Sequence, residues 1–223
     1  MIDKIPVKKE LGFVIIGNFN PEIYQPKWLA ALNFLGVEET NASDIIIISK
    51  DVTIFTTSGI SFEILRDRFC VRVTEDRYYE PMRDLVNNIF SRFTTPTFMM
   101  GVNTNSYFNI NDKKHWYKIS KVIAPKNILS EIEELKDPEL GNLVINAKRY
   151  DNYEGSINVN VGLSRAVKPS SLCLYIGIND HFIFNKDGID GGMYVSTLLR
   201  AEWETLLERF KKITDKILGS LNE

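Results

Sequence analysis

The chain has 223 residues, of which 44% are hydrophobic and 25% charged, which is typical of a globular protein and excludes a disordered or collagen-like chain. Its 27 basic and 29 acidic side chains nearly cancel, so net charge argues against a nucleic-acid or anionic-membrane partner. The first residues lack the pattern of a signal peptide, and no apolar run approaches the length of a membrane span, which predicts a cytoplasmic protein.

The first half of the chain is predicted to be rich in strands. Residues 13–19 read as a strand, and Pro26 begins a short helix that ends at Gly36. Further strands are expected at 44–50, 52–57, 60–66 and 69–74. The unbroken isoleucines at 45–48 predict a strand buried on both faces. Asp67 and Arg68 separate two strand runs and suit a tight hairpin.

Two long amphipathic helices are predicted. Apolar side chains recur along one helical face between residues 79 and 93, and again between residues 195 and 221. A strand at 98–110 follows the first helix, and a linking helical region spans 115–135. The strands expected before the second helix are 143–149, 156–163, 172–178 and 181–185.

A faint internal repeat relates the two halves. Placing Asp67-Arg68-Phe69 on Asp180-His181-Phe182 gives a displacement of 113 residues, and a long helix follows each segment. We therefore predict an α+β fold, with one or two largely antiparallel sheets covered by long amphipathic helices and an internal duplication. The halves are residues 1–111 and 112–223, as two units or as one continuous domain.

Several of these segments carry a family resemblance. They are a strand run ending in Arg-Asp-Arg-Phe at 66–69, a Val102-Asn-Thr-Asn-Ser-Tyr-Phe-Asn strand, and a closing helix that contains Trp203-Glu-Thr-Leu-Leu-Glu-Arg-Phe. This pattern, over about residues 60–218, resembles a sporadically distributed, uncharacterised bacterial protein family. The resemblance implies an α+β fold and a place in mobile or defence-type gene cassettes. It implies no catalytic residues.

The familiar catalytic patterns are incomplete. Ser164 lacks the second glycine of a nucleophile elbow, and the glycines at 188–192 lack the Lys-Ser/Thr of a phosphate loop. Asn146 stands where a metal-dependent nuclease needs a carboxylate. Asp180 and His181 are adjacent and would point to opposite faces of a strand, so a pair in a hairpin turn is the simpler interpretation. The two cysteines and two histidines form no zinc motif, so we predict no catalytic residue, metal or cofactor.

Asparagines on two predicted strands are the strongest candidate for a site. Asn103, Asn105 and Tyr107 share one face of their strand, and Asn158 and Asn160 share one face of theirs. Asparagine is uncommon in strands because its side chain competes for backbone hydrogen bonds. The simpler interpretation is a solvated sheet face. The alternative is a concave platform of hydrogen-bonding groups.

The platform would bind through its amides, with Tyr107 for stacking and Arg72 or Arg165 for charge. The function predicted first is a non-enzymatic binding or accessory protein with a protein partner, and a homodimer is possible. The alternatives are a small-molecule or nucleotide sensor that uses the asparagine face, and an enzyme whose site follows no motif.

Overall fold

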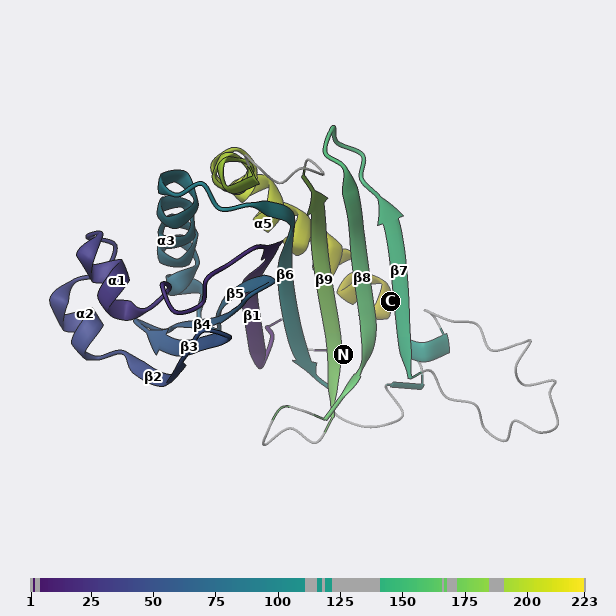
Figure 1. Ribbon diagram of the computed structural model, residues 1–223. Helices are drawn as coiled ribbons and strands as arrows, with labels where there is room; N and C mark the ends of the chain where they lie inside the picture. The colour runs from purple at the N-terminus through teal and green to yellow at the C-terminus, as the bar shows by residue number, and fades with distance from the viewer. Residues whose placement is uncertain are drawn as a thin grey trace.

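The computed structural model has one nine-stranded sheet in which every neighbouring pair of strands is antiparallel (Figure 1). The structure describes residue 2 and residues 5–110, 116–117, 119–121, 141–165, 167, 172–184 and 191–222. The strand order is β2-β3-β4-β5-β1-β6-β9-β8-β7. The sheet and its helices confirm the predicted α+β class and show that a single sheet runs through both halves.

Residues 5–92 supply five strands of the sheet. They are β1 (Lys8–Gly17), β2 (Asp44–Ile48), β3 (Val52–Thr57), β4 (Ile60–Leu65) and β5 (Arg68–Val73). Two short helices, α1 (Pro26–Ala31) and α2 (Val37–Asn41), lie between β1 and β2, and the 3₁₀ turn η1 (Asp76–Tyr78) leads into α3 (Tyr79–Arg92). The hairpin between β4 and β5 turns at Arg66 and Asp67, next to the predicted position.

Residues 97–222 supply the other four strands and the longest helix. They are β6 (Thr97–Asn109), β7 (Asn142–Lys148), β8 (Gly155–Ser164), β9 (Cys173–Ile183) and α5 (Gly191–Asn222). If the chain is divided between α3 and β6, rather than at residue 111, the two parts share a connectivity: the first strand of each pairs with the last strand of the same part, and a helix follows. The predicted linking helical region at 115–135 falls largely outside the described residues.

The core lies on the face of the sheet that α3 and α5 cover. Alternate residues of the central strands point into it, and α3 and α5 present the predicted apolar stripes. The ring of Phe90 on α3 is fully buried, with its centroid 5.4 Å from that of Phe69 on β5. The two helices also bond to each other, since Trp203 Nε1 donates to Glu80 Oε1 at 2.6 Å. None of the described helices is both long and apolar enough to cross a membrane.

A buried cluster of charged side chains anchors α5 to the far half of the sheet. The carboxylate of Asp180 on β9 is fully buried and accepts hydrogen bonds from both Arg149 and Arg209. Arg149 also donates to Asp151, with Nη2 2.6 Å from Oδ2, and Arg209 Nη2 lies 3.3 Å from the same oxygen. Two guanidinium groups and two carboxylates balance, so no charge is buried alone.

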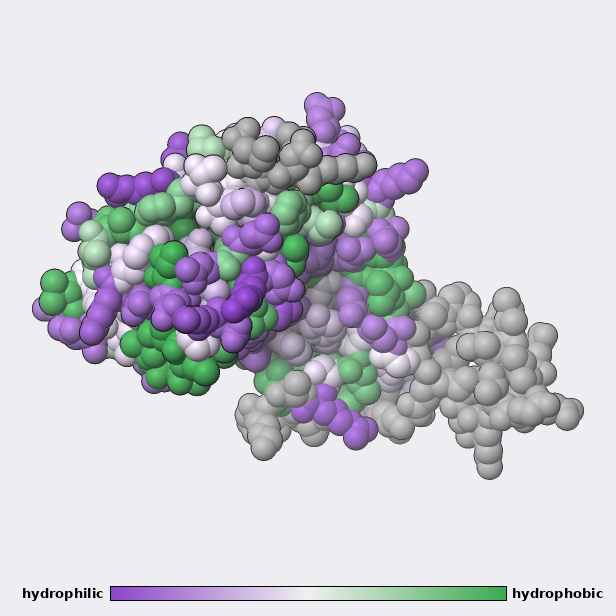
Figure 2. Space-filling model, viewed as in Figure 1, coloured by the Kyte–Doolittle hydropathy of each residue, from purple (hydrophilic) through white to green (hydrophobic). Residues whose placement is uncertain are grey.

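Residues 45–48 are not buried on both faces, so that prediction is wrong. They form most of β2, which is the edge strand of the sheet, and Ile46 is 70% exposed. An apolar run is typical of a central strand, but the position of a strand in the sheet depends on distant pairings that the run itself does not encode. Figure 2 shows hydrophobic side chains gathered at this end of the molecule.

The predicted break between residues 178 and 181 is also wrong. Residues 173–183 form one strand, β9, and Asp180 and His181 lie inside it rather than in a hairpin turn. The alignment that suggested the repeat therefore places the β4–β5 turn on the middle of a strand. The polar pair Asn179-Asp180 is typical of a turn, but its two side chains lie on opposite faces of the sheet.

Candidate functional site

The face of the sheet that turns away from α3 and α5, here the open face, carries polar residues and glycines on β6 and β9, together with apolar side chains such as Val14 and Ile54 on β1 and β3. Alternation along β6 sends Val102, Thr104 and Ser106 toward the helices, and Asn103 and Asn105 to the open face. Along β9, Tyr175 and Asn179 share that face. The predicted division of the strands into an apolar side and an amide side is therefore present.

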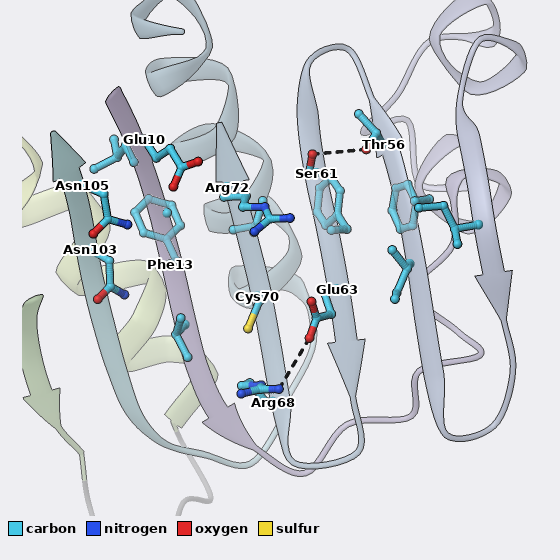
Figure 3. Close-up of a pocket in the computed structure, with 18 residues that line it drawn as sticks. Glu10, Phe13, Thr56, Ser61, Glu63, Arg68, Cys70, Arg72, Asn103 and Asn105 are labelled. Atoms are coloured by element: carbon cyan, nitrogen blue, oxygen red, sulfur yellow. Dashed lines mark hydrogen bonds and ion pairs between the residues drawn. The ribbon is translucent and has the colours of Figure 1, made fainter. Parts of the chain in front are cut away.

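The open face is hollowed over its central strands. A cavity of about 420 Å³ lies over β3, β4, β5, β1 and β6, so the face is concave there (Figure 3). Its polar lining consists of Thr56, Ser61, Glu63, Arg68, Cys70, Arg72, Glu10, Asn103 and Asn105. We call this cavity the hollow. Its volume lies within the range of about 300–1,000 Å³ that is usual for ligand pockets.

Most of the charges around the hollow are paired along its walls. Arg68 Nη2 lies 3.5 Å from Glu63 Oε1, and Lys8 Nζ lies 2.7 Å from Glu10 Oε1. Arg72 stands between them on β5 and is exposed, and no described carboxylate forms an ion pair with it. The hollow therefore offers one guanidinium group, with its donors in a fixed fork, to whatever enters it.

The amides on β6 bond to the neighbouring strand instead of pointing straight into solvent. Asn179 Nδ2 donates to Asn103 Oδ1, and Tyr175 Oη donates to Asn105 Oδ1 at 2.7 Å. Glycines make room for these bonds: a Cβ on Gly101 would lie 2.7 Å from Asn179 Nδ2, and one on Gly177 would lie 2.2 Å from Tyr175 Oη. The polar side chains thus lie flat across β6 and β9, which fixes their orientation.

Four asparagines form a continuous row across the open face. Asn103, Asn179, Asn158 and Asn146 are direct cross-strand neighbours on β6, β9, β8 and β7, and we call them the amide row. Asn158 Nδ2 donates to Ser156 Oγ at 3.4 Å, which is a weak bond. Within the row, the bond from Asn179 to Asn103 is the one that joins two of its amides among the described residues.

The two tyrosines of this face lie beside the amide row. The rings of Tyr107 and Tyr175 have centroids 5.2 Å apart, and Lys8 Nζ lies 5.7 Å from the centroid of Tyr107. Burial, and then the nearby Glu10 carboxylate, raises the pKa of Tyr107, so its phenol stays protonated and can donate. These rings extend the polar face with an aromatic surface.

The electrostatics of the open face do not activate a nucleophile. Burial raises the pKa of the Cys70 thiol, which keeps it protonated at neutral pH. Burial, and next the positive charge of Arg149, lowers the pKa of His181. Within the described part of the chain, no three of the His, Cys, Asp and Glu side chains are grouped as a metal would require. The arrangement is suited to recognising a ligand by hydrogen bonds and charge.

The structure brings only some of the predicted site residues together. Arg72, Asn103 and Asn105 line the hollow. Tyr107, Asn158 and Asn160 lie on the same face but outside the lining of the hollow, and the Oδ1 atom of Asn160 is buried without a hydrogen-bond partner among the described residues. Arg165 follows the end of β8 and is exposed, so the structure does not bring it to the hollow.

Several residues of the site were missed from the sequence. Tyr175 and Asn179 bond directly to the predicted amides, but the expected turn at residues 179–180 concealed the alternation that would have placed them on the same face. Glu10 was missed because the first strand was expected to begin at residue 13, whereas β1 begins at Lys8. The buried Leu11, Phe13 and Ile15 at every second position, continued back from residue 13, were the signal available for it.

Comparison with known proteins adds no family to this geometry. No protein-family model matches the chain, and no curated protein matches it significantly.

Proposed function

We propose that the chain is a non-enzymatic binding protein that holds a segment of a partner protein in the hollow of its open face. The observation that carries this proposal is the convergence of Arg72, a guanidinium group with no ion-pair partner among the described residues, with the fixed amides of Asn103 and Asn105 in one concave surface. A solvated face would need neither the curvature nor the glycines that hold the amides in place.

A polypeptide suits this surface because a side-chain amide carries the same donor and acceptor as a peptide group. Asn105 Oδ1 accepts from Tyr175, and its Nδ2 makes no bond to another described residue, so it can donate to a backbone carbonyl of the partner. Arg72 would pair with an acidic side chain of the same segment, since a guanidinium group binds a carboxylate through two parallel bonds. The expected partner segment is therefore polar and carries at least one Asp or Glu.

A small-molecule or nucleotide sensor is the second candidate, and one observation favours it. The hollow has a volume of about 420 Å³, enough for a single ligand of modest size. An enzyme with a motif-free site is the third class, and the protonated Cys70 thiol gives it no support. A ligand with a phosphate or carboxylate group would use Arg72 in the same way as a peptide would.

The test is a selection from a phage-displayed library of random peptides on the purified chain. The selected peptides are then titrated against wild type, against the Arg72→Ala/Asn105→Ala variant, and against Arg165→Ala. Arg165 is the matched control, because it is an exposed arginine just after the end of β8 and does not line the hollow. Circular dichroism and thermal melting establish that all three proteins are folded.

We expect enrichment of acidic peptides whose affinity falls at least tenfold in the double variant and is unchanged in Arg165→Ala. Peptides that bind the double variant as well as wild type would overturn the proposal. If no peptide is enriched while nucleotides raise the melting temperature of wild type but not of the double variant, the sensor replaces the peptide-binding protein.

We also propose that the two halves derive from an internal duplication, which their shared connectivity supports, although the 113-residue alignment does not. Membership of the resembled bacterial family, with its mobile or defence-type cassettes, and a cytoplasmic location belong to the same proposal. A helix-swapped chain, in which residues 79–92 replace the first half of α5, would fail to fold if the two halves are unrelated in their packing.

A further inference from the structure

A second cavity lies on the opposite side of the sheet from the hollow. Its volume is about 350 Å³, and it lies where β1 and β6 meet the start of α3 and the second half of α5. Its apolar walls include Leu11, Phe108 and Phe210, which are 1%, 1% and 6% exposed. Thr104 and Ser106 on β6 also line it, whereas Asn103 and Asn105 on the same strand line the hollow. One strand therefore separates the two cavities.

Four hydroxyl groups line this cavity, and all but that of Thr214 belong to buried residues. Tyr79, Thr104 and Ser106 are 7%, 3% and 5% exposed, so each is more than nine-tenths buried. The enclosed hydroxyl of Tyr79 has no partner at normal hydrogen-bond geometry among the described residues, although the Asp76 carboxylate lies near enough to act on it. The oxygen atoms of Thr104 and Ser106 are not among the enclosed atoms that lack a partner, so they are open to the cavity. Buried polar groups are nearly always bonded, so the Tyr79 hydroxyl indicates that something in the cavity bonds to it.

Tyr79 is suited to act as a donor in this cavity. Burial, and then the neighbouring carboxylate of Asp76, raises the pKa of its phenol, which therefore stays protonated at any physiological pH. Thr104 and Ser106 can each donate and accept. The polar group of a ligand would meet all three on one side and the apolar walls on the others.

The charges at the rim of the cavity balance. Lys9 Nζ lies 3.4 Å from Asp76 Oδ1, and Lys211 and Asp215 stand one turn apart on α5. Two positive and two negative side chains give no net field that would favour an ion. A volume of about 350 Å³ is near the lower end of the usual range for ligand pockets, which suits a molecule of one or two rings.

We propose that this cavity binds an uncharged aromatic or heterocyclic small molecule, with its ring against Leu11, Phe108 and Phe210 and its polar substituent bonded to the hydroxyl of Tyr79. The site is separate from the hollow and needs no partner protein. It is also separate from the predicted small-molecule sensor, which would use the asparagine face.

The experiment titrates 2-naphthol, an uncharged two-ring probe with one hydroxyl, into the ¹⁵N-labelled chain and follows backbone amide shifts. Tyr79→Phe removes only the hydroxyl, and Thr104→Val replaces a second hydroxyl by a methyl group. Tyr24→Phe is the matched control, because Tyr24 is also buried but its hydroxyl bonds to Thr95 at 3.3 Å. The same titration with 2-naphthoate tests whether the site prefers an uncharged ligand.

We expect saturable shifts in residues 104–108 and 207–215. The dissociation constant should rise about two- to tenfold in Tyr79→Phe and in Thr104→Val, the loss of one hydrogen bond, and should be unchanged in Tyr24→Phe. Absence of saturable shifts at millimolar probe, shifts confined to the open face, or equal affinity in wild type and both cavity variants would overturn the site. Tighter binding of 2-naphthoate than of 2-naphthol would overturn the uncharged ligand class. Failure of the peptide selection leaves these outcomes unaffected, because they concern the other face.

Discussion

The two faces of the sheet are built from the same strands but obey different chemistry. On the helix-covered face, aromatic and branched side chains fill the core, and its charges are buried as the balanced cluster around Asp180. On the open face, Asn179 lies over Gly101 and donates to Asn103 on the neighbouring strand, and Tyr175 donates to Asn105. One face provides stability through burial, whereas the other keeps its hydrogen-bonding groups oriented at a surface. Substitutions should therefore affect the two faces very differently.

The largest effect is expected where the helix-covered face is most tightly packed. Phe90 is fully buried, and its ring contacts Phe19 and Phe69. Phe90→Ala should lower the free energy of unfolding by about 3–5 kcal/mol, because it removes apolar contact and leaves a cavity. Urea unfolding measures this value. Phe34→Ala, at a partly buried ring, is the control, and an equal loss in both would mean that Phe90 does not anchor α3.

A loss of similar size is expected from the buried charges of the same face. Asp180→Ala would leave Arg149 and Arg209 without their shared carboxylate, which typically costs about 3–5 kcal/mol. Replacing all four members of the cluster, Asp151 included, by apolar residues of similar volume should cost less than the single change, since no charge then stays buried alone. Urea unfolding of both variants checks this order, and a larger loss in the fourfold variant would contradict it.

A smaller, pH-dependent effect should arise at the margin of that cluster. The hydrogen bond from Arg149 holds the pKa of Asp151 below its usual value of about 4. A lowered carboxyl pKa contributes stability above the unfolded pKa, and this contribution is lost as pH falls through the folded pKa. Between about pH 5 and pH 2, wild type should therefore lose more free energy of unfolding than Asp151→Asn. His181 variants need a separate comparison. The pKa of His181 is also lowered in the folded protein, so its contribution to the free energy of unfolding is lost as pH falls, beginning near pH 6.5.

The helix-covered face was largely predictable from the sequence, and the open face only in part. Periodicity gave α3, α5 and most strands, because a buried stripe constrains residue type at every turn or every second residue. It also placed Asn103 and Asn105 on one face. It could not give the strand order, which joins β1 to both β5 and β6 and so brings Glu10 and Arg72 to the same hollow. The edge position of β2 and the continuity of β9 depend on the same long-range pairing.

On the open face, effects should be smaller and should depend on the bonds within it. Asn179→Ala removes the donor to Asn103 Oδ1, so it should lower the free energy of unfolding by about 0.5–1.5 kcal/mol. Asn179→Ser keeps a donor but shortens its reach. Its free energy of unfolding should therefore lie between those of Asn179→Ala and wild type, or equal that of Asn179→Ala. Urea unfolding measures all three proteins. A loss as large as that of Phe90→Ala would contradict the division between the two faces.

The smallest effect is expected at the end of the amide row. Asn146 is the cross-strand neighbour of Asn158 on β7, an edge strand, and its side chain is exposed. Asn146→Ala should change the free energy of unfolding by no more than about 0.5 kcal/mol, because exposed substitutions that break no buried bond rarely do more. Asn146 and Asn179 are the same residue type in one row. The difference in the free energy of unfolding between their alanine variants therefore measures the effect of burial and hydrogen bonding, not of residue type. Equal losses at both positions would mean that the row acts as a cooperative network extending to the edge, and the open face would then contribute to stability in the way that the core does.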